Sequence, residues 1–208
     1  MKAIQYTAAY AALILGVSVC IGYLFKVELL LSWSDGSMPS IESPATFALF
    51  FMTIMAFAAH KKLGNYREFI IVACAAFMMG AIFITYFSAW VMRDVPFSNA
   101  RDYVGSSDLP ALSNGVAIMI MSVSGFMRGF FDRIGAAMFL SRIAALIGAT
   151  TLIGHVMNID WLLLYWEHTQ FPIALPASVS LILCGIAING RLAGAASGPE
   201  STRISVNG

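Results

Sequence analysis

The strongest constraint on the fold of this chain is a motif that recurs at an interval of 66 residues. Pro44, Pro110 and Pro176 keep this interval, and each is followed by alanine. An acidic residue stands 16 positions before each proline, and these residues are Glu28, Asp94 and Asp160. Such regular spacing indicates one structural unit that is present three times.

The sequence consists of long apolar runs that are separated by short charged loops. The chain is 59% hydrophobic and 11% charged, whereas soluble domains carry about 25% charged residues. A membrane-spanning helix needs about 20 mostly apolar residues, because the hydrocarbon core is about 30 Å thick. Six runs approach this length: 6–25, 44–60, 68–92, 111–127, 136–157 and 175–191. The sequence therefore predicts an all-α, multi-pass membrane protein with six transmembrane helices.

The prolines organise these runs into three repeated helical hairpins. Each recurring proline begins an even-numbered run, and proline suits the first turn of a helix, where its missing N–H would be unpaired anyway. We therefore expect a structural role for Pro44, Pro110 and Pro176. The hairpins form a single membrane domain, 1–191, with units at about 1–62, 63–128 and 129–191.

The distribution of basic residues predicts the orientation. Nine lie in the segments between hairpins and at the termini, and three lie in the loops within hairpins. By the positive-inside rule, both termini are cytoplasmic. The first run lacks a cleavage site and is predicted to be a retained span. Residues 192–208 are predicted to be a disordered cytoplasmic tail.

Small residues along the odd-numbered runs predict close helix packing, because association in lipid depends on close backbone approach. These residues are Gly16, Gly22, Gly80, Gly148 and Gly154, of which Gly22 and Gly154 are assigned the clearest structural role. Arg128 and Arg142, near inner span ends, are expected to reach the lipid headgroups. Three cysteines without metal-ligand spacing are expected to be free thiols, namely Cys20, Cys74 and Cys184.

Two of the loops within hairpins, the outer loops, are rich in leucine and tryptophan. Residues 27–33 and 159–166 are predicted to form short amphipathic helices at the membrane interface. In the second loop, Trp161, Tyr165, Trp166 and His168 form a candidate site for a small cationic or amphipathic ligand, since aromatic faces attract cations. The alternative is an ordinary aromatic belt.

His155 is the candidate polar residue within a span. A neutral imidazole can ligate haem or bind a quinone, but no second histidine lies at a similar depth, so a hydrogen bond to a neighbouring helix is favoured. Glu28, Asp94 and Asp160 either form a negative ring around a threefold axis or orient the loop helices that follow them.

Motifs for catalysis are absent from the sequence. It contains no nucleophile elbow, zinc-protease motif or phosphate-binding glycine loop. No basic groove indicates nucleic acid. Since no carboxylate or lysine lies in the interior of a predicted span, ion-coupled transport lacks its usual groups. We predict no enzyme activity, no cofactor and no metal site.

Three segments resemble a known class of bacterial membrane module. Ser43–Phe50 (SPATFALF), Leu175–Ile182 (LPASVSLI) and Gly154–Leu163 are similar to the multi-span sensor modules that precede some histidine kinases and diguanylate cyclases. The resemblance implies a membrane-embedded sensory or regulatory role. The 17 residues after Arg191 are too few for an output domain, so a signal is expected to pass to a separate partner.

The sequence therefore predicts a non-enzymatic sensory, regulatory or accessory subunit in the bacterial inner membrane. Its expected partners are membrane lipids, a lipidic ligand, and another membrane protein or a second copy of itself. The first alternative is a small transporter or channel. The second is a redox or pigment subunit that holds its cofactor through His155.

Overall fold

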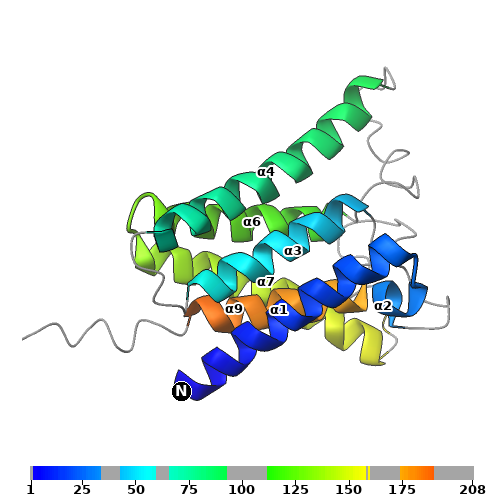
Figure 1. The fold of residues 1–208 in the computed structure, drawn as a ribbon, viewed down its shortest axis with the longest axis horizontal. Helices are drawn as coiled ribbons and strands as arrows, with labels where there is room; N and C mark the ends of the chain where they lie inside the picture. Colours follow the sequence, from blue (N-terminus) through cyan, green and yellow to red (C-terminus); the bar gives the residue numbers. More distant parts are fainter. Residues whose placement is uncertain are drawn as a thin grey trace, which may run out of the picture.

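The computed structural model describes residues 2–33, 43–59, 66–92, 112–157, 159 and 174–189. These residues form helices and no strand, which confirms the all-α prediction for this part of the chain (Figure 1). The helices are α1 (Lys2–Phe25), α2 (Glu28–Ser32), α3 (Ser43–Ala58), α4 (Tyr66–Met92), α6 (Leu112–Gly129), α7 (Ile134–Met157) and α9 (Leu175–Asn189).

In the described part of the chain, α1, α4 and α7 contain segments long and apolar enough to cross a membrane. Helices α3 and α9 are apolar but shorter. Both begin one residue before a recurring proline, Pro44 in α3 and Pro176 in α9, which agrees with the preference of proline for the first helical turn. Pro110 lies outside the described residues. The number of six spans and the repetition of the hairpins stay predictions.

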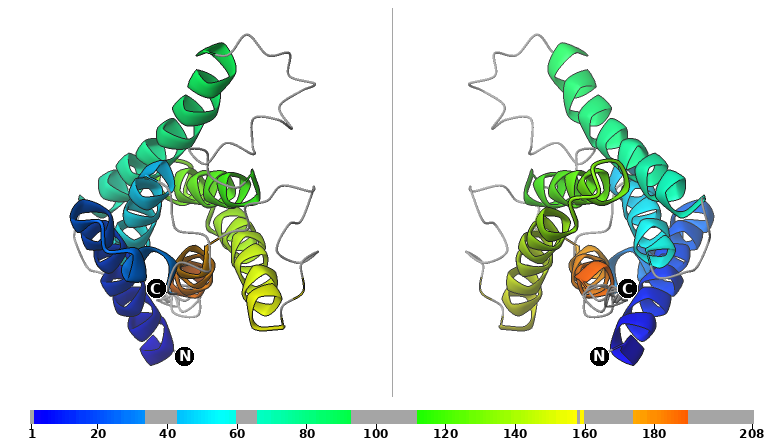
Figure 2. Two further views of the ribbon diagram at one scale, coloured as in Figure 1. Left: turned by 90° about the vertical axis from the view of Figure 1, so that its right-hand side faces the viewer. Right: turned by 90° about the vertical axis from the view of Figure 1, so that its left-hand side faces the viewer.

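The helices pack in a closed ring of contacts. Helix α1 packs against α3 and α9, α4 packs against α3 and α6, and α7 packs against α6 and α9. Helix α3 also contacts α6 and α9. The end-on views in Figure 2 show α9 between α1 and α7. The first and last described helices are therefore neighbours.

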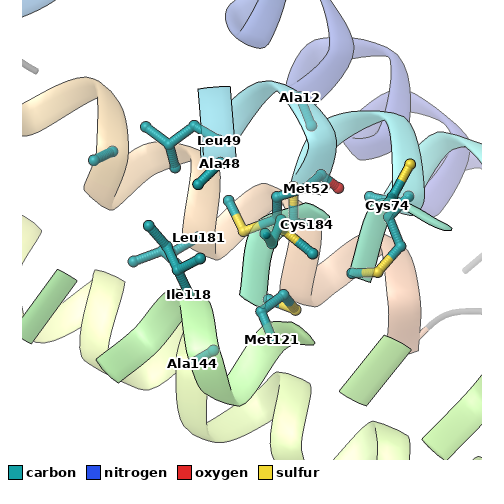
Figure 3. Packing of buried hydrophobic residues seen from close by; sticks show 14 of the residues in the cluster. Ala12, Ala48, Leu49, Met52, Cys74, Ile118, Met121, Ala144, Leu181 and Cys184 are labelled. Atoms are coloured by element: carbon teal, nitrogen blue, oxygen red, sulfur yellow. Dashed lines mark hydrogen bonds between the residues drawn. The ribbon is translucent and has the colours of Figure 1, made fainter. Parts of the chain in front are cut away.

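Burial along α3, α6 and α9 follows the 66-residue interval of the sequence. Met52, Ile118 and Cys184 stand at equivalent positions, and each is 0% exposed. Figure 3 shows these side chains in the core together with Leu49 and Leu181. Three further sets of equivalent positions are also buried: Ala48, Asn114 and Ser180; Met55, Met121 and Ala187; Ala56, Ser122 and Ile188. The three helices thus turn equivalent faces inward.

The longer helices α1, α4 and α7 bury equivalent positions in the same way. At the interval of 66, the buried sets are Ala9, Ala75 and Ser141; Ala12, Met78 and Ala144; and Gly16, Ile82 and Gly148. Most of these side chains are small, so the helix axes approach closely, as expected where packing rather than the hydrophobic effect joins helices.

Several glycines stand at close contacts between helices, among them Gly16, Gly148 and Gly185. A Cβ added to Gly148 would lie 2.7 Å from the carbonyl oxygen of Ser178 and 2.8 Å from Cβ of Leu181. A Cβ at Gly16 would overlap the hydroxyl of Thr53, and one at Gly185 would lie 2.5 Å from Cβ of Ala145. These glycines therefore set the separation of α1 from α3 and of α7 from α9.

The other predicted packing glycines differ in their surroundings. A Cβ at Gly22 would lie 2.7 Å from Cβ of Leu30 in the neighbouring α2. Gly22 and Gly154 each accept a hydrogen bond five residues on, from the N–H of Val27 at 2.8 Å and of Ile159 at 3.0 Å. Gly80 has no atom within 4 Å of an added Cβ, so the prediction of a tight contact there is wrong. All three cysteines are free thiols, as predicted.

The contrast between Gly148 and Gly80 gives a matched test of packing. Gly148→Ala should lower the free energy of unfolding by about 1 to 3 kcal/mol, because the backbone of Ser178 cannot move aside for the new methyl group. Gly80→Ala should leave stability unchanged or raise it by up to about 1 kcal/mol, since alanine is the better helix former. Thermal unfolding in detergent measures both, and equal melting of the two variants would contradict the packing assignment.

Candidate functional site

The structure describes two of the predicted site residues that carry a polar side chain. His155 lies half-buried in the last turn of α7. Glu28 is exposed in the first turn of α2, where the cap residue, Val27, makes no side-chain capping bond. Figure 1 shows α2 and the end of α7 at the same end of the bundle. We call this the α2 end.

The remaining candidates of the sequence analysis lie outside the described residues. They are Asp94, Asp160, Trp161, Tyr165, Trp166 and His168. The negative ring and the aromatic ligand site therefore stay predictions. Among the residues that the structure describes, no three His, Cys, Asp or Glu side chains gather as metal ligands.

A polar cluster that the sequence did not predict joins α7 to the C-terminal end of α9. Nε of Arg142 donates a hydrogen bond of 3.0 Å to Oδ1 of Asn189. Nδ2 of Asn189 donates to Oγ of Ser141 at 3.0 Å and to the carbonyl oxygen of Gly185 at 2.7 Å. The amide of Asn189 is thus held by both helices, and it fixes the position of the Arg142 side chain.

A second arginine binds the same helix end. Nη1 of Arg128, in the last turn of α6, donates a hydrogen bond of 3.0 Å to the carbonyl oxygen of Ile188. Carbonyl groups in the last turn of a helix lack partners within that helix and carry partial negative charge. Arg128 therefore stabilises the end of α9 by binding one of these carbonyl groups, in addition to any contact with headgroups. The sequence could not show this, because Ile188 lies 60 positions from Arg128.

In the described part of the chain, the helices of the bundle form two grooves whose linings differ in chemistry. The α4–α6–α7 groove has a volume of about 700 Å³ and is lined by apolar and aromatic side chains, among them Phe83, Tyr86 and Val123. The α1–α7–α9 groove has a volume of about 610 Å³. Its lining combines apolar residues with three polar ones, Gln5, Arg142 and Asn189. This second groove therefore places a cation beside an apolar surface.

One buried amide stands apart from both grooves. Asn114 is 5% exposed, and its Oδ1 has no hydrogen-bond partner in the described part of the chain. The equivalent positions hold Ala48 and Ser180, so this amide is particular to the second unit. A buried polar atom without a partner is costly.

Removal of an arginine should test the capping of α9. Arg128→Gln should lower the free energy of unfolding by about 1 to 3 kcal/mol, the usual worth of a hydrogen bond from a charged group. Arg133→Gln is the matched control, because Arg133 is exposed in the turn between α6 and α7. Thermal unfolding in detergent compares the two, and a variant at 128 as stable as the one at 133 would exclude the capping role.

Comparison of the chain with protein-family models, with curated proteins and with solved structures finds no match.

Proposed function

We propose that this protein is a six-span, non-enzymatic sensory, regulatory or accessory subunit of the bacterial inner membrane, in which three helical hairpins close into a ring. Two features support the six-span architecture. Equivalent positions are buried at the interval of 66 residues in both sets of helices. Helix α1 also meets α9, as it would if three like units closed around an axis.

The observation that carries the functional proposal is the chemistry of the two grooves. Within the described ranges, Arg142 is the only charged residue that lines either of them. Both grooves open on the outside of the bundle, where a membrane protein meets lipid. Such surfaces favour an acyl chain or an apolar partner helix over a polar substrate. A subunit that senses a lipidic ligand or accompanies another membrane protein needs this kind of surface.

The packed centre of the bundle favours this proposal over transport. Met52, Ile118 and Cys184 meet there with no exposed surface, and Sγ of Cys184 lies 3.8 Å from the carbonyl oxygen of Met52. A conduction path through the middle would require these side chains to separate.

The six-span topology predicts the result of thiol labelling in intact cells. With a reagent that cannot cross membranes, Glu28→Cys should be labelled from the periplasm and Arg133→Cys only after the membrane is permeabilised. Both side chains are exposed. The parent chain, whose three cysteines lie within helices, gives the background. Labelling of Arg133→Cys in intact cells would disprove the orientation.

The subunit role predicts a stoichiometric complex. After extraction from native membranes in mild detergent, the protein should run with a second membrane protein in a fixed ratio, measured by quantitative mass spectrometry. The purified protein should show no visible absorption band and should carry no solute across proteoliposome membranes. Solute flux by the protein alone would favour the transporter alternative instead, and a visible band would favour the cofactor alternative.

A further inference from the structure

One outward-facing pair of positions holds different side chains in the first and third units. In the first unit, the rings of Tyr10 on α1 and Phe57 on α3 pack edge to face, with centroids 5.3 Å apart. At the interval of 132 residues, the same two positions hold Arg142 and Asn189, which form the 3.0 Å hydrogen bond described above. An aromatic pair in one unit thus corresponds to a cationic and amide pair in another.

Aromatic side chains also join α3 to α4. The rings of Phe51 on α3 and Phe77 on α4 stack with centroids 4.7 Å apart. The positions equivalent to Phe51 hold Ala117 in α6 and Leu183 in α9. The outer face of α3 is thus covered by rings, whereas the grooves beside α6 and α9 are open.

The polar end of the α1–α7–α9 groove has unused hydrogen-bond donors. Arg142 carries five N–H donors, and only Nε has a partner in the described part of the chain. Gln5, in the first turns of α1, is 9% exposed, and its amide has no hydrogen-bond partner among the described residues. Among the residues that the structure describes, no carboxylate lines the groove. This end therefore suits an anion.

The remainder of the groove is apolar. Beyond Arg142, the lining continues along α7 through Leu146 and Ala149 and along α9 through Ile186 and Ile182. Gln5 lies in the first turns of α1, Arg142 lies in the N-terminal half of α7, and Asn189 is the last residue of α9. The polar groups thus lie toward the bundle end opposite the α2 end, which is cytoplasmic in the proposed topology. The apolar lining points toward the middle of the membrane.

We infer that the α1–α7–α9 groove binds one anionic phospholipid of the cytoplasmic leaflet. This inference rests on the proposed six-span topology. The free guanidinium N–H groups of Arg142 bind phosphate oxygens, as arginine does well because of its planar set of donors. The amide of Gln5 donates a further bond, and an acyl chain lies along Leu146, Ala149 and Ile182. Asn189 is a positioning residue that orients Arg142.

Native mass spectrometry of the purified full chain tests this site with two lipids that share the same acyl chains. The parent should retain phosphatidylglycerol about fivefold more than phosphatidylethanolamine, the preference expected from one basic side chain at a membrane surface. Arg142→Gln should abolish the preference, and Arg133→Gln should keep it. Equal retention of the two lipids by the parent, or equal loss in both variants, would overturn the inference.

A second variant copies the aromatic pair of the first unit into the third unit. R142Y/N189F places the aromatic pair of Tyr10 and Phe57 at the equivalent positions, so it should fill the groove, keep the thermal stability of the parent, and lose both lipids from this site. Parent-like retention by this variant would overturn the inference, and if the variant does not fold, Arg142→Gln decides. Glycerol phosphate without acyl chains should not compete, and full competition by it would overturn the role of the chain.

The lipid experiment is separate from the test of topology. Retention of lipid without any dependence on Arg142 would disprove this site and leave the proposed membrane topology intact. Periplasmic labelling of Arg133→Cys would disprove the topology, whatever the lipid preference in detergent.

Discussion

Close backbone approach between helices is the constraint on which this structure depends. In lipid, apolar side chains gain little by leaving one apolar environment for another, so helices associate through packing and interhelical hydrogen bonds. Here α7 and α9 approach so closely that a methyl group at Gly148 would meet the backbone of Ser178. Between α1 and α3, a methyl group at Gly16 would overlap the side chain of Thr53. These contacts fix the separation of α7 from α9 and of α1 from α3.

Closure of the ring has a consequence for the α1–α7–α9 groove. Its walls are α1 from the beginning of the chain and α7 from the third unit, with α9 between them. The groove therefore forms only when α9 meets α1. A ligand held there touches the first and the last described helices, so its binding would stabilise the closed ring over any arrangement in which the first helix moves away.

The inner and outer faces of the units obey different constraints. Buried positions such as Met52, Ile118 and Cys184 share tight space around one centre, so their size is restricted. Outer positions meet lipid, which adapts to their shape, so the same site can hold Phe57, Val123 or Asn189. Different side chains at the outer positions can therefore give each groove its own chemistry, while the equivalent inner positions stay buried in all three units.

The sequence by itself determined the extent of the helices, because helix length and proline placement are local properties: the predicted runs 6–25 and 175–191 correspond closely to α1 and α9. It identified Gly16 and Gly148 as packing positions but also Gly80, since a glycine within a predicted span does not show which residue lies beside it. The presence of Arg142, Asn189 and Gln5 in the lining of one groove depends on the tertiary structure alone. Arg142 and Asn189 are 47 positions apart, and only the packing of α1 and α7 beside α9 brings them to one groove.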